Sequence, residues 1–109
     1  MPVSDLDIAP STVGEIIVMA REGDTMQRQL HQFIADLNDD EKASLTAIAW
    51  VGRGAFEAED FAEALATARA EATTPTESYL MGMPHLVENL EAGLEALGYD
   101  VSDIEDDAL

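Results

Sequence analysis

The chain contains no cysteine and no long apolar run, and these absences exclude several kinds of structure and chemistry. Without cysteine among its 109 residues it has no disulfide, no thiolate metal site and no cysteine nucleophile. No apolar run approaches the ~20 residues that a membrane-spanning helix needs. Residues 1–7 are acidic and lack the apolar segment of a signal peptide. We therefore expect a soluble, cytoplasmic protein.

Basic residues are also scarce. The chain has five Lys and Arg residues and 23 Asp and Glu residues, which gives a formal net charge of -18. This charge repels nucleic acid phosphates and anionic lipids, so we expect no direct nucleic acid binding and no membrane binding. Simple solubility or adaptation to a salty cytoplasm explains such a surface most economically. A surface directed at a basic partner remains an alternative.

Candidate catalytic and metal-binding residues are few. The two histidines, His31 and His85, do not lie near a serine in a known nucleophile motif. His85, Glu88 and Glu91 recur at the helical spacing used in metal-binding bundles, but one such set supplies too few ligands. We interpret them as a solvated acidic helix face. The sequence thus predicts no catalytic residue, no metal site and no cofactor.

Helical periodicity runs from Thr12 to Leu97, and no segment alternates with the period of two that marks a strand. We predict an all-α fold, a compact bundle of five or six short helices without significant sheet. Residues 11–99 would form its single domain. Capping and stop signals predict helices near residues 12–22, 25–37, 39–51, 58–71, 74–81 and 84–97.

The predicted helix at 39–51 should be the most buried element, and both ends of the chain should be tails. Asn38 and Glu41 have the spacing of a capping box at its start, and residues 45–51 are the least polar stretch of the chain. Residues 1–10 are predicted to form an N-terminal tail. Residues 100–109 contain five acids and no base, which predicts an acidic disordered tail.

Arg53 is the most informative base, because it lies between two glycines and follows the only tryptophan, Trp50. We favour a structural role in which its guanidinium caps the preceding helix or pairs with an acid. The alternative is an anion site in which Arg53 and His85 line a pocket. Trp50 and Tyr79 fit a core position better than a ligand platform. The candidate functional or structural cluster is Trp50, Arg53, Tyr79 and His85.

Three stretches resemble a bacterial family catalogued as domain of unknown function 3775. They are residues 49–57 (AWVGRGAFE), 77–86 (ESYLMGMPHL) and 94–99 (LEALGY). The most specific pieces are Trp-x-Gly-Arg-Gly and Tyr-Leu-x-Gly-x-Pro-x-Leu, and the similarity covers about residues 38–99. The resemblance implies a small helical domain and brings no activity, cofactor or catalytic residue with it.

These observations favour a non-catalytic interaction or regulatory module that binds an unknown protein partner, for which a homodimer is one form. The reasons are the shortage of nucleophiles and histidines and the many apolar helix faces, one of which could remain exposed as a contact patch. The alternative is a small-ligand binder or enzyme with a pocket near Arg53, Tyr79 and His85, assisted by Glu77 or Glu88. A further alternative is an acidic mimic of nucleic acid. A pocket at Arg53 would favour the ligand binder.

Overall fold

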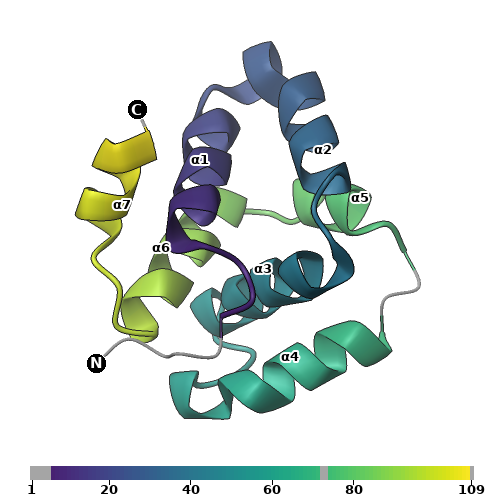
Figure 1. Cartoon of the computed structure of the whole chain (residues 1–109), viewed down its shortest axis with the longest axis vertical. Coiled ribbons are helices and arrows are strands. Elements are labelled where there is room, and N and C mark those ends of the chain that lie inside the picture. Colours follow the sequence, from purple (N-terminus) through teal and green to yellow (C-terminus); the bar gives the residue numbers. More distant parts are fainter. Residues whose placement is uncertain (1–5, 72–73, 109) are drawn as a thin grey trace.

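The computed structural model describes residues 6–71 and 74–108, and every regular element in these ranges is helical (Figure 1). This confirms the all-α prediction, with one helix more than we expected. None of the described helices has the length and apolar character needed to cross a membrane. The seven α-helices are α1 (Pro10–Arg21), α2 (Gln27–Ala35), α3 (Asp39–Gly52), α4 (Phe61–Ala70), α5 (Thr76–Met81), α6 (Leu86–Ala96) and α7 (Val101–Ala108), and short 3₁₀ turns at Gly23–Met26 and Ala58–Asp60 precede α2 and α4.

Helix α3 lies at the centre of the fold (Figure 1). All of residues 43–51 are buried, so the apolar run is enclosed as we expected. The predicted capping box is present at its start. The side chain of Asn38 accepts the Glu41 N–H at 2.7 Å, and the Glu41 carboxylate accepts the Asn38 N–H at 3.0 Å. These bonds satisfy two amides that a helix start leaves unpaired, and so fix where α3 begins.

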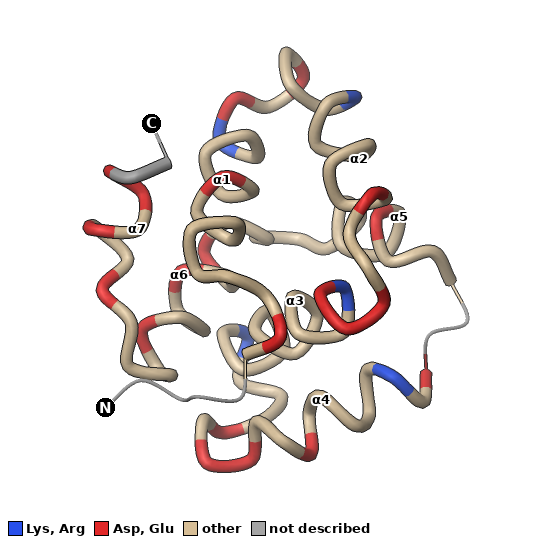
Figure 2. Tube along the Cα trace, viewed as in Figure 1, with Lys and Arg blue, Asp and Glu red and all other residues tan. Residues whose placement is uncertain are grey.

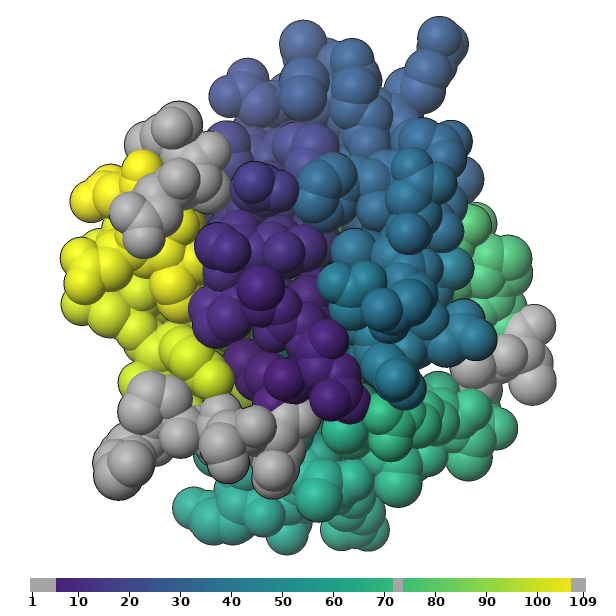
Figure 3. All heavy atoms as spheres, in the orientation of Figure 1, coloured from purple at the N-terminus to yellow at the C-terminus, as the bar shows by residue number. Residues whose placement is uncertain are grey.

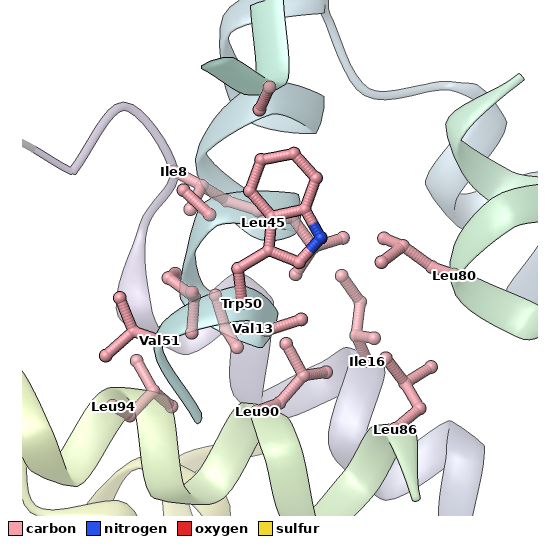
Figure 4. Packing of buried hydrophobic residues seen from close by; sticks show 14 of the residues in the cluster. Ile8, Val13, Ile16, Leu45, Trp50, Val51, Leu80, Leu86, Leu90 and Leu94 are labelled. Carbon is pink, nitrogen blue, oxygen red and sulfur yellow. The ribbon is translucent and has the colours of Figure 1, made fainter. Parts of the chain in front are cut away.

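The backbones of α3 and α6 touch where the helices cross, and this is the most extensive helix pairing in the fold. A Cβ atom on Gly93 would lie 2.1 Å from the Ile48 carbonyl oxygen, and one on Gly52 would lie 1.6 Å from that of Asn89. Only glycine fits at such positions. The approach lets Leu90 and Leu94 point from α6 into the core around α3 (Figure 4).

The acidic C-terminal residues form a helix, so our prediction of a disordered tail at 100–109 was wrong. α7 packs along α1, and Figure 3 shows its side chains directly against those of α1. Val101 is buried and Ile104 packs on the core, close to the bare backbone of Gly14. The two apolar side chains lie one turn apart on the inner face, while acids such as Asp103 face solvent. Leu109 lies outside the described residues.

A cluster of charges joins α7 to the rest of the molecule. Arg21, at the end of α1, donates hydrogen bonds to the carboxylates of Glu91 on α6 and Glu105 on α7. Burial, followed by the hydrogen bond and the charge of Glu105, raises the pKa of the Glu91 carboxyl group. Arg21 thus offsets the repulsion between two acids that helix packing brings together.

The predicted N-terminal tail is also partly packed. Ile8 is 2% exposed, and the Asp7 N–H donates a hydrogen bond of 2.9 Å to the Ser44 hydroxyl on α3. α1 begins at Pro10 rather than at Thr12, because proline at a first helical position is already set to the helical φ. Residues 1–5 of that predicted tail lie outside the described part of the chain.

We predict that Gly93→Ala lowers the free energy of unfolding by about 2–3 kcal/mol, because the added methyl group forces α3 and α6 apart. Intrinsic helix propensity acts in the opposite direction and favours alanine by about 1 kcal/mol. Urea denaturation measures the change. Gly82→Ala is the matched control, since a Cβ atom there meets its nearest neighbour at an ordinary 3.4 Å. An unchanged midpoint for Gly93→Ala would contradict the close crossing.

Ending the chain after Asp100 should lower the free energy of unfolding by about 2–4 kcal/mol, because it removes the buried Val101 and the partly buried Ile104. Thermal and urea unfolding of the full-length and shortened chains provide the comparison. Ser102→Ala, at an exposed position of α7, serves as the control and should melt like the parent. If the shortened chain is equally stable, the packing of α7 contributes nothing to the fold.

Candidate functional site

A cavity of about 730 Å³ opens between α3, α4 and α5, and we call it the groove. Its walls are one face of α3, the C-terminal end of α4, and α5 with Thr74 before it. Pockets of roughly 300–1,000 Å³ are the usual size for small organic ligands. The groove is therefore large enough to hold a small molecule.

The face of α3 that lines the groove follows from the spacing of its residues. Lys42, Thr46, Trp50 and Arg53 all line it and succeed one another every three or four positions. Such residues lie above one another on a helix, and eleven residues at 1.5 Å each span roughly 16 Å. The groove thus runs along the axis of α3, with Lys42 toward one end and Arg53 toward the other.

Trp50 and Tyr79 are hydrogen-bonded to each other in the wall of the groove. The Trp50 indole N–H donates to the Tyr79 hydroxyl oxygen at 2.9 Å, and Figure 4 shows the indole nitrogen pointing toward the side where Leu80 of α5 lies. Trp50 also stacks on Phe56, in the segment between α3 and α4, with ring centroids 5.8 Å apart. Trp50 is 8% exposed and Tyr79 is 36% exposed. The bond satisfies a nearly buried donor and presents the tyrosine ring at the surface.

The charge of the groove differs from that of the chain. Lys42, Arg53 and Arg69 line it, which are three of the five basic residues, and Figure 2 shows basic segments on both α3 and α4. Three acids, Asp39, Asp40 and Glu71, also line it, so the formal charge of the lining is 3 − 3 = 0. The groove is thus close to neutral on a chain whose formal net charge is -18.

One of the three bases is already paired. The Arg69 guanidinium donates to Asp7 at 2.8 Å and to Asp40 at 3.0 Å. Neither Lys42 nor Arg53 has an ion pair with any carboxylate of the described residues. The Arg69–Asp40 contact also shows that the end of α4 meets the start of α3. The three acids of the lining therefore gather at that end of the groove, away from Arg53.

The structure does not show the structural role that we favoured for Arg53. Its backbone N–H closes α3 by donating to the Ala49 carbonyl at 3.0 Å, but its side chain is exposed. The guanidinium makes no hydrogen bond with another described residue, so it neither caps the helix nor completes a buried pair. It is left available at one end of the groove.

Three of the four candidate residues come together, and His85 does not join them. Trp50, Arg53 and Tyr79 line the groove, whereas His85 and Glu88 border a separate hollow of about 300 Å³ near α1 and α2. His85 is the N-cap of α6 with φ 59°, and its ring nitrogen lies 4.0 Å from the Glu88 carboxylate. No group of three or more His, Asp or Glu side chains in the described ranges is arranged to hold a metal ion.

Sequence reasoning missed Lys42, Thr46 and Arg69 as lining residues. The helical spacing of Lys42 and Thr46 with Trp50 and Arg53 could have identified the first two. Arg69 carries no comparable signal, because its position depends on how α4 packs on α3. Of the carboxylates proposed as helpers, Glu88 borders the other hollow, and one oxygen of Glu77 is buried without a hydrogen-bond partner in the described structure.

Within the described residues, the fold and the groove define a small all-α domain with a ligand-sized cavity beside its central helix. The family model described as "Protein of unknown function (DUF3775)" matches residues 27–99, so the chain belongs to this family. The match includes every lining residue of the groove, from Asp39 to Tyr79, whereas α1 and α7 lie outside it. Neither curated proteins nor solved structures gave a match to the chain.

We predict that Tyr79→Phe lowers the free energy of unfolding by about 0.5–1.5 kcal/mol, because the Trp50 indole N–H loses its acceptor. Hydrogen exchange of the indole proton, followed by NMR, should become faster. Arg53→Ala is the comparison and should stay within about 0.5 kcal/mol of the parent, as expected for an exposed, unpaired side chain. Equal losses of stability in both variants would contradict this description of the site.

Proposed function

We propose that this protein is a small-molecule-binding module and that the groove between α3, α4 and α5 is its binding site. The observation that carries the proposal is the hydrogen-bonded pair of Trp50 and Tyr79 in the wall of a cavity of about 730 Å³. Ligand sites typically combine such apolar and aromatic walls with a few polar groups that fix orientation. Thr46 and Arg53 are polar groups of this kind in the same lining.

The site is also formed in advance of binding. Trp50 is held on one side by Phe56 and on the other by Tyr79, and it belongs to the most buried helix of the fold. Side chains that are already ordered lose little entropy when a ligand binds, so more of the contact energy appears as affinity. The exposed part of the Tyr79 ring is the apolar surface that a ligand would cover.

The composition of the groove supports binding rather than turnover. Neither His31 nor His85 is among its described lining residues. Histidine is the side chain that most often transfers protons near neutral pH. The acids at the other end of the groove are accompanied by Lys42 and Arg69, and Arg69 holds Asp40 directly. We therefore propose a receptor without a catalytic step.

Binding to a protein partner through an apolar patch, which the sequence favoured, has less support. Tyr79 is the one large hydrophobic residue that is exposed within the described ranges, and it lies at the groove. A contact patch on a small protein usually covers a few hundred Å² of contiguous apolar surface. The apolar faces of the helices are instead directed into the core.

We also propose that the module works in the bacterial cytoplasm. This is supported by the lack of cysteine and by the resemblance to a bacterial family. The acidic surface then serves solubility, because net charge of one sign keeps copies of the chain apart.

A fragment screen tests the proposed function. The chain has a single tryptophan, so an NMR spectrum contains one indole N–H signal, and this signal comes from the wall of the groove. We expect aromatic fragments to shift it at millimolar concentration. Thr76→Phe, which fills the groove from α5, should weaken this binding at least about tenfold, whereas Ser102→Phe on α7 should not. If no fragment moves the signal, the proposal is wrong.

A further inference from the structure

Building on the proposed function, we infer that the groove selects an organic anion. The ligand would carry a flat apolar body, which covers the exposed ring of Tyr79 beside Trp50, and a carboxylate or phosphate group, which Arg53 and the Tyr79 hydroxyl bind. The formal net charge of -18 alone would instead suggest that the protein repels anions. Three features of the groove support it.

The first feature is the direction of the hydrogen bond between the two aromatic residues. A tryptophan indole can only donate, so the Tyr79 hydroxyl oxygen acts as the acceptor at 2.9 Å. The hydroxyl hydrogen of Tyr79 has no acceptor among the described residues. Accepting one hydrogen bond strengthens a hydroxyl group as a donor. The groove therefore offers a polarised donor, which calls for an oxygen acceptor on the ligand.

The second feature is the place of Arg53. It follows Trp50 by three positions on the face of α3 that lines the groove, so the two side chains are neighbours. Its guanidinium has no partner in the described structure and offers a planar set of donors that matches a carboxylate or phosphate. The Tyr79 hydroxyl contacts Trp50, and Arg53 is a neighbour of Trp50. Both donors therefore lie at the same end of the groove.

The third feature is the separation of charge along the groove. Asp39 and Asp40 start α3 and Glu71 ends α4, and the Arg69–Asp40 contact joins these two ends. Arg53 follows Asp39 by fourteen positions, which is roughly 21 Å of helix. Among the described lining residues, the end at Arg53 therefore has one base and no acid. Elsewhere on the chain, outside the lining, two bases accompany 20 acids (5 − 3 and 23 − 3).

Four probes with one ring system test this inference. They are 2-naphthoate, 2-naphthyl phosphate, the neutral 2-naphthamide and the cationic 2-naphthylmethylammonium. Titration calorimetry and the Trp50 indole signal report their binding to the full-length protein at neutral pH. We expect at least one anion to bind roughly tenfold more tightly than the amide, and the cation to bind most weakly. The stronger of the two anions identifies the group, carboxylate or phosphate ester.

Variants of Arg53 and Tyr79 test whether these two donors cause the preference for the anion. Arg53→Gln should reduce the preference for the anion over the amide to about one, and Arg53→Lys should restore it only in part, since lysine lacks the planar donor set. Tyr79→Phe should reduce the preference by a smaller factor. Arg28→Gln, which removes an exposed base of α2 outside the groove, is the control and should keep the parent preference.

The outcomes separate the two proposals. If the amide binds as tightly as both anions, or the cation binds best, the groove is a binding site but the inference of an anionic ligand is wrong. The same holds if Arg53→Gln keeps the preference of the parent. If none of the four probes binds and the fragment screen is also negative, the proposed function itself fails.

Discussion

The contact between the backbones of α3 and α6 at Gly52 and Gly93 determines how the other elements are arranged. Two helices that touch without intervening side chains cannot slide past one another, because any shift brings a carbonyl oxygen into a Cα atom. The crossing fixes α6 on one side of α3 and places Leu90 and Leu94 in the core. The opposite face of α3 is then left for α4 and α5. The groove lies on that face.

The groove exists because the last turns of α3 carry residues that do not suit a closed core. Trp50 is nearly buried but needs a partner for its indole N–H, and Tyr79 on α5 supplies it. Arg53 ends the helix at a turn where Gly54 takes a positive φ of 87°. A charged side chain at such a turn prevents α4 and α5 from closing over it. The polar end of the central helix thus keeps a space open beside the core.

The features of this structure that depend only on residues close together in the sequence could be predicted. The capping box of Asn38 and Glu41, the apolar run inside α3 and the positive φ of Gly98 after α6 are features of this kind. α7 was missed because its stability depends on Gly14, about 90 residues away, which leaves room for Ile104. The charge density of residues 100–109 was visible, but the space that receives their apolar face was not.

The candidate site shows the same limit. Trp50, Arg53 and Tyr79 were among the candidates, and the first two stood out because the single tryptophan precedes by three positions an arginine that lies between two glycines. The exposure of the Arg53 side chain could not be predicted, because it depends on which helices pack over the turn that follows α3. His85 was expected to line a pocket with Arg53, but it lies at the start of α6 with a left-handed backbone conformation and borders a different hollow. Arg69 reaches the groove only through the packing of α4.

The position of the groove beside α3 gives it one rigid wall and one adjustable wall. α3 is enclosed by other helices along residues 43–51 and cannot move without disturbing the core. α5 is only six residues long, packs mainly on α2 and touches α3 lightly, and the Tyr79 hydroxyl is its polar link to that helix. If the groove binds ligands as we propose, a thicker ring system would displace α5 rather than α3, because α5 has fewer contacts to lose.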